Sequence, residues 1–206
     1  YKRQVGGLSR SQPQVRSTLE PYDMMIVLGA DVLRMSVWDA VDPLPEDLPI
    51  IQIGLNDWEM GKNYAAEMAI GSDVCETLKA LTPVLKERGG SQLADAATKR
   101  MAALASNNWS ANRASLIKRI EYEGSGEPIN PDWLMLQISE ALPDNGIIVN
   151  EGVTASRYLN DIHPYRERHD FHGLASGGIG WGIAAAVGVQ LAHPDRPVCA
   201  IIGDGS

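Results

Sequence analysis

Short runs of apolar residues alternate along this chain with polar, proline-rich or glycine-rich segments. Residues 24–30 and 50–53 are two such runs, and neither shows the regular polar alternation of a strand that faces water on one side. Continuous apolar runs of this length are typical of strands buried on both faces of a parallel sheet. The acidic segment between them, residues 42–49, contains three prolines, so we expect a loop there.

A helix is predicted after the second strand. Residues 63–69 form a single helical turn at most, and Ser72 or Asp73 then caps a helix whose apolar positions recur as far as Leu85. Gly90 ends this pattern, as glycine commonly does at the C-terminal end of a helix. The order strand, loop, strand, helix is half of a doubly wound α/β unit.

The second half of the chain has the same alternation of strands and helices. Asn130 and Pro131 carry the signals of a helix start, an N-cap followed by proline at the first helical position. One apolar strand is predicted at residues 146–150 and another at residues 198–202. Residues 183–192 are small and apolar on every side, so we expect a fully buried helix.

These patterns predict an α/β protein of two partial doubly wound parallel-sheet domains joined by a helical linker. Residues 1–90 would be the first domain, in which the polar residues 1–20 are disordered or a remnant. Residues 91–126, rich in alanine and mixed charges, would be the linker, and residues 127–206 the second domain. Because the chain begins at Tyr1 and stops just after an apolar run, we expect a fragment of a longer protein.

Composition narrows the class of partner. The chain has 18 Lys and Arg against 26 Asp and Glu, a formal net charge of −8, which gives no electrostatic support to nucleic-acid or anionic-membrane binding. No apolar stretch is long enough to span a bilayer. Cys75 and Cys199 lie in apolar surroundings with no metal-binding spacing, so we expect buried thiols in a reducing, cytoplasmic compartment.

Candidate chemistry lies in three loops, residues 151–154, 176–182 and 203–206. The first and third follow predicted strands, and ligands of open parallel sheets bind outside the carboxyl ends of the strands. The middle loop leads into a helix, where backbone N–H groups face an anion. In the third loop two glycines flank Asp204, which leaves its carboxylate free for a hard cation such as Mg²⁺. The three loops together indicate one diphosphate-bearing cofactor.

The glycine motif at residues 176–182, followed at this spacing by the turn at residues 203–206, resembles the C-terminal cofactor domain of thiamine-diphosphate-dependent enzymes. It is most similar to the benzoylformate decarboxylase and acetolactate synthase branch. Residues 22–87 resemble the central domain of the same family. The resemblance implies an enzyme that uses thiamine diphosphate and Mg²⁺: the cofactor ylid attacks a small 2-oxo acid, and CO₂ is then lost.

The resemblance also implies roles for particular residues. Asp204 would be the metal ligand, the Gly177 carbonyl would accept from the 4′-amino group, and Ile179 would bend the cofactor into its V shape. No catalytic residue is expected in this chain, because the glutamate that activates the aminopyrimidine belongs to the family's N-terminal domain. The implied cofactor-binding residues are Gly152, Val153, Thr154, Leu174, Ala175, Gly177, Ile179, Gly203, Asp204, Gly205 and Ser206.

Several alternatives stay open. Benzoylformate decarboxylases have a catalytic histidine in the central domain, and by this resemblance its position is occupied here by Ser36, which leaves the substrate side chain open. The parent protein would be either a 2-oxo acid decarboxylase or an acetolactate-synthase-like transferase, because the acceptor pocket that separates them lies largely outside this chain. The family implies a homodimer or homotetramer, and the 206-residue chain alone is expected to be inactive. Two further readings are a non-catalytic homologue and a dinucleotide binder, since Gly180, Gly182 and Ala185 match the looser dinucleotide fingerprint.

Glu151 and three histidines are expected to have structural roles. Glu151 is expected to be a strand-end carboxylate with a structural partner rather than a catalytic group. His163, His169 and His172 lie close together in a polar segment, but no cysteine or acidic residue is spaced to complete a zinc site. We therefore expect these histidines to lie in a solvated loop.

Overall fold

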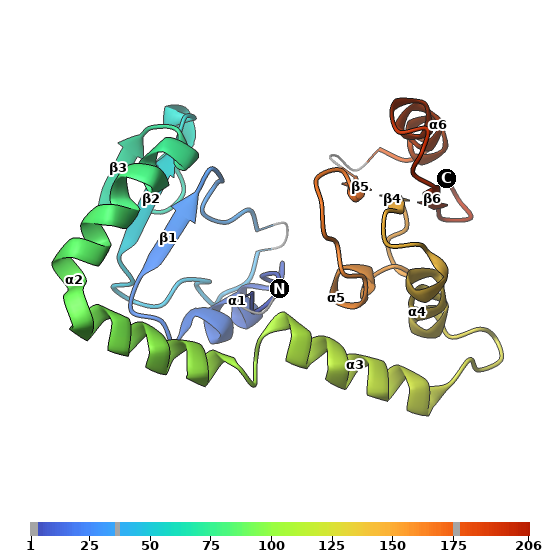
Figure 1. The fold of residues 1–206 in the computed structure, drawn as a ribbon, viewed down its shortest axis with the longest axis horizontal. Coiled ribbons are helices and arrows are strands. Elements are labelled where there is room, and N and C mark those ends of the chain that lie inside the picture. Colours follow the sequence, from blue (N-terminus) through green and yellow to red (C-terminus); the bar gives the residue numbers. More distant parts are fainter. Residues whose placement is uncertain (1–3, 36–37, 175–177) are drawn as a thin grey trace. The chain divides into compact units, whose positions relative to one another are not determined.

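The computed structural model describes residues 4–35, 38–174 and 178–206. The chain divides into two compact units, one of Gly7–Ala102 and one of Tyr1–Gly6 with Ala103–Ser206 (Figure 1). Each unit contains a three-stranded parallel sheet. The α/β class predicted from the sequence is therefore confirmed.

In the first unit the sheet order follows the chain, β1-β2-β3. The middle strand is the best buried, because partners cover it on both edges. Its register pairs Ile53 with Leu28 on one side and with Ile70 on the other, so the carboxyl ends of all three strands lie together. The elements of this unit are α1 (Gln12–Leu19), β1 (Met25–Leu28), β2 (Ile50–Gly54), η1 (Asp57–Glu59), β3 (Met68–Gly71) and α2 (Val74–Leu104).

Helix α2 begins as predicted and continues beyond its predicted end. The Asp73 carboxylate accepts from the Glu76 N–H at 3.0 Å, which satisfies one of the free donors of the first turn. Gly90 takes a left-handed conformation with φ 51° and breaks the helical path. Helical residues resume directly and run to Leu104, because the alanine-rich sequence that follows favours helix.

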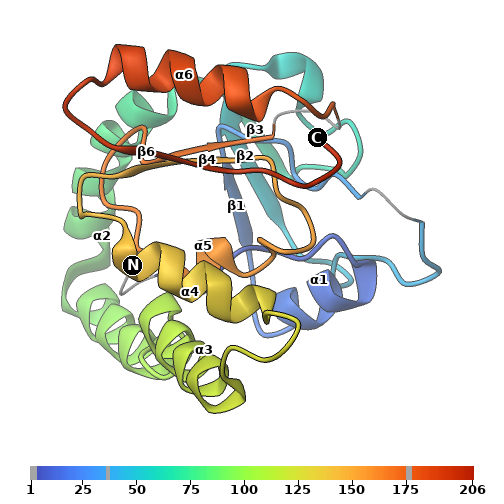
Figure 2. The same ribbon diagram turned by 90° about the vertical axis from the view of Figure 1, so that its right-hand side faces the viewer.

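In the second unit the sheet order is β5-β4-β6. Figure 2 shows α6 on one face of this sheet and α4 with α5 on the other. The buried core packs Ile120, Leu136 and Leu159 of three helices against Ile148 of the central strand. The elements are α3 (Trp109–Glu123), α4 (Pro131–Ala141), β4 (Ile147–Asn150), α5 (Leu159–Ile162), β5 (Phe171–Gly173), α6 (Gly182–Ala192) and β6 (Val198–Ile201).

The helix start at Asn130 is confirmed. Its side-chain oxygen accepts from the Asp132 N–H at 2.9 Å, and Pro131 occupies the first helical turn. Helix α3 is capped in the same way, because the Asn108 side chain accepts from the Ala111 N–H at 3.0 Å. These caps are local signals, since each depends on residues within three positions of one another.

Several expectations are wrong in detail. Residues 12–19, expected to be disordered or a remnant, form α1, because Val15 is fully buried. Residues 63–69, expected as a helical turn, instead lead into β3, which pairs with β2. The first unit ends at Ala102, so residues 91–126 are divided between the units. Cys75 is exposed, because it lies in the first turn of α2.

Burial also differs from expectation on two apolar elements. In β1 only Val27 is buried, whereas Ile26 and Leu28 are exposed. Helix α6 packs against β4 and β6 with one face, and Ile183 and Leu191 on the opposite face are 64% and 77% exposed. The helix expected to be buried on all sides is thus covered on one side only, because no other described residues pack on its outer face.

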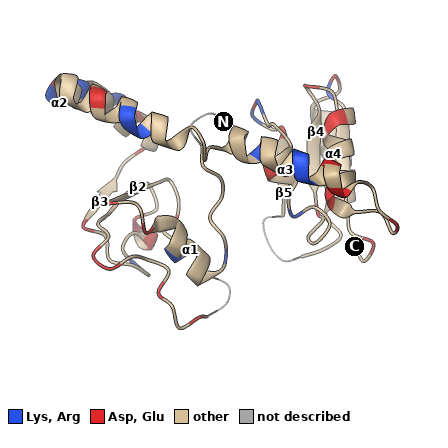
Figure 3. Cartoon of the chain, turned by 90° about the horizontal axis from the view of Figure 1, so that it is seen from below, with Lys and Arg blue, Asp and Glu red and all other residues tan. Residues whose placement is uncertain are grey.

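Both signs of charge occur along the two long helices. Figure 3 shows blue and red segments along α2 and α3, and ion pairs join Lys79 to Glu76 at 2.7 Å and Arg119 to Glu123 at 3.4 Å. Such pairs along one helix stabilise it slightly. Within the described residues, no helix is long and apolar enough to cross a membrane.

Candidate functional site

The carboxyl edge of the second sheet brings two predicted loops together. Strands β4 and β6 are parallel neighbours with Asn150 opposite Ile201. The Ile201 carbonyl accepts from the N–H groups of Glu151 and Gly152, at 2.8 and 3.2 Å. The loop after β4 is therefore hydrogen-bonded to the strand end that leads into residues 203–206. This is the arrangement expected at the ligand edge of a parallel sheet.

Glu151 connects the glycine motif to the same edge. Its carboxylate is only 3% exposed. Oε1 accepts from the Gly180 N–H at 2.5 Å, and Oε2 accepts from the Gly182 N–H. The N–H of Gly180 is the strongest influence that holds the pKa of Glu151 below its usual value; burial opposes it, and the Gly182 N–H, the Ser206 hydroxyl and the Trp181 N–H lower it further. The structural partner expected for Glu151 is confirmed.

Two glycines at this edge are required by close approach. A Cβ on Gly182 would lie 2.7 Å from Oε2 of Glu151 and 3.1 Å from its Cβ. A Cβ on Gly152 would lie 2.9 Å from Oγ of Ser156, and that hydroxyl already donates to the Gly152 carbonyl at 2.6 Å. Since separations below 3.0 Å demand that something move, both positions exclude any larger residue without rearrangement.

The turn after β6 presents a carboxylate to solvent. The Ser206 N–H donates to the Gly203 carbonyl at 3.1 Å, and Asp204 is exposed at the tip. Among the described residues, the group of acidic, histidine or cysteine side chains close enough to hold a cation is Asp73, Cys75 and Glu76, all exposed, in the other unit. Asp204 is thus a single protein carboxylate, suited to an ion that takes its other ligands from elsewhere.

The remaining predicted residues follow the ends of the three strands. Val153 is 73% exposed after β4, Leu174 is exposed after β5, and Ile179 is 67% exposed before α6. Because β5, β4 and β6 are all parallel, Leu174 lies at the same edge as residues 151–154 and 203–206. Ala175 and Gly177 lie outside the described residues, as does Ser36 of the first unit.

The sequence interpretation of the histidines is wrong for His163. This residue is 8% exposed, and its Nδ1 lies 3.0 Å from the Ser139 hydroxyl. Burial lowers the pKa of His163. The rings of His169 and His172 stack at 6.1 Å, and the ring of His193 lies 5.6 Å from that of His169. Hydrophobic periodicity could not reveal these contacts, because Ser139 of α4 and His193, which follows α6, are distant in sequence from the histidines they meet.

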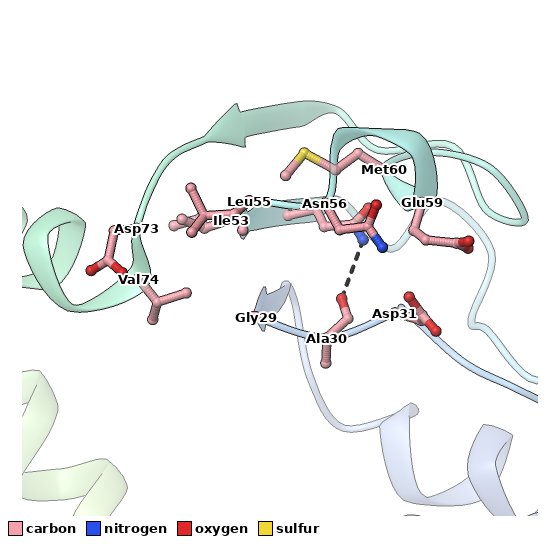
Figure 4. Close-up of a pocket in the computed structure, with 12 residues that line it drawn as sticks. Gly29, Ala30, Asp31, Ile53, Leu55, Asn56, Glu59, Met60, Asp73 and Val74 are labelled. Carbon is pink, nitrogen blue, oxygen red and sulfur yellow. Dashed lines mark hydrogen bonds between the residues drawn. The ribbon is translucent and has the colours of Figure 1, made fainter. Parts of the chain in front are cut away.

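A separate cavity of about 340 Å³ lies at the carboxyl ends of the first unit's strands (Figure 4). Asp31, Glu59 and Asp73 contribute carboxylates to its lining, and neither Lys nor Arg is among the lining residues. The buried Gln52 amide donates to the Ala30 carbonyl at 3.3 Å. Asp31 and Glu59 are already paired with Arg34 and Lys62, and no cationic side chain lines the cavity to bind a phosphate group.

Comparison with known families agrees with the division of the chain. Residues 151–206 match the family model for the C-terminal TPP binding domain of thiamine pyrophosphate enzymes. Residues 2–81 match the model for the central domain of the same enzymes. The chain belongs to the thiamine pyrophosphate enzyme family. The carboxyl edge of the second sheet therefore lies in the family's cofactor-binding domain.

Relatives of two activities are similar to this chain. Benzoylformate decarboxylase of Pseudomonas aeruginosa is 29% identical over 202 residues, covering 98% of this chain and 33% of the relative. Acetolactate synthase isozyme 1 large subunit of Escherichia coli is 26% identical over 200 residues, covering 93% of this chain and 32% of the relative. The chain thus spans about a third of the length of the curated relatives it matches.

A solved structure shares the fold. The thiamine diphosphate-dependent 4-hydroxybenzoylformate decarboxylase of Rhodococcus jostii RHA1 superposes with a TM-score of 0.68 and 24% identity. The match covers 99% of this chain and 35% of that one. At this identity the likeness concerns the fold.

Proposed function

We propose that this chain forms part of a thiamine-diphosphate- and Mg²⁺-dependent enzyme that decarboxylates a small 2-oxo acid. The observation that carries the proposal is the shared edge of the second sheet. There the loop after β4, the glycine motif and the Gly203–Ser206 turn are joined through Glu151 and Ile201. Ligand edges of parallel sheets are built in this way.

The residues present fit this cofactor. Gly152 admits no Cβ beside Ser156, which keeps the loop after β4 close to the strand end, and the backbone of residues 152–154 and of the Gly203–Ser206 turn would hold the diphosphate. Asp204 offers an exposed carboxylate oxygen, the type of ligand that Mg²⁺ prefers. The exposed side chains of Leu174 and Ile179 offer apolar surface to the cofactor's rings. Ala175 and Gly177 would complete this surface, as the family resemblance implies.

In this proposal the cofactor supplies the chemistry and the residues of this chain bind and orient it. When bound, thiamine diphosphate supplies an electron sink for the carbon that loses CO₂. The chain's own residues bind and orient: the turn fixes the charged end, and Ile179 limits the conformations of the apolar end. Asp204 neutralises part of the positive charge of the metal ion. No acid or base for the reaction is assigned to this chain, in keeping with the family resemblance.

An acetolactate-synthase-like transferase is the alternative activity, because relatives of that kind are similar over almost the same length. In either case we propose a cytoplasmic homodimer or homotetramer. A dinucleotide binder is less well supported, since the N–H groups of Gly180 and Gly182 that its fingerprint would turn to a pyrophosphate already donate to Glu151. A non-catalytic homologue would differ by failing to bind the cofactor.

The test is calorimetric titration of thiamine diphosphate into the protein with and without Mg²⁺. We expect binding that requires Mg²⁺. In Asp204→Ala the dissociation constant is expected to rise tenfold or more, because the ion loses a ligand. Asp195→Ala is the matched control, because Asp195 is also an exposed turn carboxylate of the second unit. Equal binding by the wild type and Asp204→Ala would refute the metal-ligand role. Absence of binding by the wild type would favour the non-catalytic homologue.

A further inference from the structure

The N-terminal end of α6 is faced by an anion that belongs to the protein itself. The first N–H groups of a helix lack intrahelical partners and carry a partial positive charge. In α6 the Gly182 N–H donates to Oε2 of Glu151, and the preceding Gly180 N–H donates to Oε1. Both carboxylate oxygens of Glu151 are therefore bound by the glycine motif. The sequence had predicted that the N–H groups of this motif face the cofactor.

The contact leaves no space for a second anion at the same donors. Glu151 is 3% exposed, and a single Cβ added to Gly182 would already lie 2.7 Å from its Oε2. Gly180 has φ +87°, a conformation that glycine adopts readily and that turns its N–H toward the carboxylate. The fit of Glu151 to the loop thus depends on two glycines and one buried charge.

We propose that Glu151 is a positioning residue whose carboxylate, in place of the cofactor's diphosphate, is the anion bound by the Gly180 and Gly182 N–H groups. It fixes the glycine loop against the end of β4. The cofactor part of this statement rests on the proposed function; the loop part does not. The diphosphate is then left to residues 152–154 and the Gly203–Ser206 turn.

The arrangement gives the carboxylate a definite effect on the site. Ile179 directly precedes Gly180 and is exposed, so the position of its side chain depends on the two hydrogen bonds to Glu151. One buried charge therefore sets the apolar side of the proposed cofactor site.

The loop part is tested by NMR on the protein without cofactor, through the amide signals of Gly180 and Gly182. We compare wild type with Glu151→Gln, which keeps the shape but replaces one acceptor oxygen with an NH₂ donor. The Gly180 and Gly182 amide protons are expected to shift upfield and to exchange with solvent about tenfold faster or more. Glu140→Gln, an exposed carboxylate of α4, is the matched control and is expected to change neither amide.

Glu151→Asp keeps the charge on a shorter side chain and guards against a variant that fails to fold. It is expected to retain part of the downfield shift at one of the two glycines. Unchanged shifts and exchange at Gly180 and Gly182 in both Glu151 variants would overturn the proposal. So would loss of the difference in these two amide shifts between wild type and Glu151→Gln when thiamine diphosphate and Mg²⁺ are added, because the cofactor would then be their acceptor.

The cofactor part is measured by calorimetry on the same variants. We expect Glu151→Gln to weaken thiamine diphosphate binding by about tenfold, with partial recovery in Glu151→Asp. If the amides respond to Glu151→Gln but the wild type does not bind the cofactor, the loop assignment stands and the proposed function fails. If binding is present and identical in all variants, the proposed function stands and the positioning role is refuted.

Discussion

Substitution of Gly152 by alanine offers a quantitative test of the packing at the carboxyl edge of the second sheet. The new Cβ would lie 2.9 Å from Oγ of Ser156, 3.2 Å from Oδ1 of Asn150 and 3.3 Å from Cγ2 of Ile201. None of these neighbours is the far end of a long side chain. The Asn150 oxygen accepts from the Gly152 N–H at 3.0 Å, and the Ser156 hydroxyl donates to its carbonyl. Relief of the contacts therefore breaks a hydrogen bond or moves a strand end.

Inserting one methyl group into a filled site costs about 1–3 kcal/mol. We expect Gly152→Ala to lose stability in that range in urea denaturation, with a melting temperature lower by several degrees. Gly188→Ala is the control, because a Cβ there meets no atom within 4 Å and Gly188 lies within α6. Alanine at such a helical position stabilises by about 0.4–1 kcal/mol. Replacing glycine by alanine is thus expected to lower the free energy of unfolding at position 152 and to raise it at position 188.

A double variant isolates the cause. Ser156→Ala removes the atom nearest to the new methyl group, at the cost of its hydrogen bond to the Gly152 carbonyl. The double variant is expected to be more stable than the sum of the single effects by about 0.5 kcal/mol or more, because the two sites are in contact. A neutral or stabilising Gly152→Ala, or strict additivity with Ser156→Ala, would refute the packing argument.

Two further outcomes follow from buried side chains of the second unit. Leu136→Ala is expected to lower the free energy of unfolding by about 2–5 kcal/mol in chemical denaturation, because Leu136 is fully buried in the core; a loss below about 1 kcal/mol would contradict that placement. Although burial alone would raise the pKa of Asp170, the N–H groups of Glu167 and Arg166 and the Arg196 guanidinium lower it below its usual value. The ionised Asp170 therefore stabilises the folded state above its unfolded-state pKa, and this stabilisation is lost as pH falls through the folded-state pKa. The difference in melting temperature between wild type and Asp170→Asn is accordingly expected to shrink toward pH 3. A difference that stays constant from pH 7 to pH 3 would contradict this sign.

Local signals in the sequence were sufficient for much of the fold. The strands at residues 50–53 and 146–150 and the caps at Asp73 and Asn130 depend on residues close in sequence. The glycine motif and the turn containing Asp204 were sufficient to indicate the family, because their spacing is specific. These features could be predicted from the chain alone.

The remainder depended on contacts between distant residues. The partners of Glu151 lie 29 and 31 positions away, so nothing in the sequence indicated which anion the helix N-terminus would meet. The exposure of Ile183 and Leu191 depends on what covers α6, a property of neighbours and not of the helix. Helix α1 was missed although Pro13 occupies its first turn, because the polar composition of residues 1–20 was given more weight than the proline signal.

The two strand orders have a consequence for synthesis. In the first sheet the central strand β2 meets one neighbour made before it and one made soon after, ending at Gly71. In the second sheet both neighbours of the central strand β4 are made later, and β6 is completed only at Ile201. On a ribosome the first sheet can therefore close while the second is still being translated. Strand β4 leaves the exit tunnel without a partner. The edge that pairs with β5 waits roughly 20 residues of elongation and the edge that pairs with β6 roughly 50, during which each is open to chaperones and to other nascent chains.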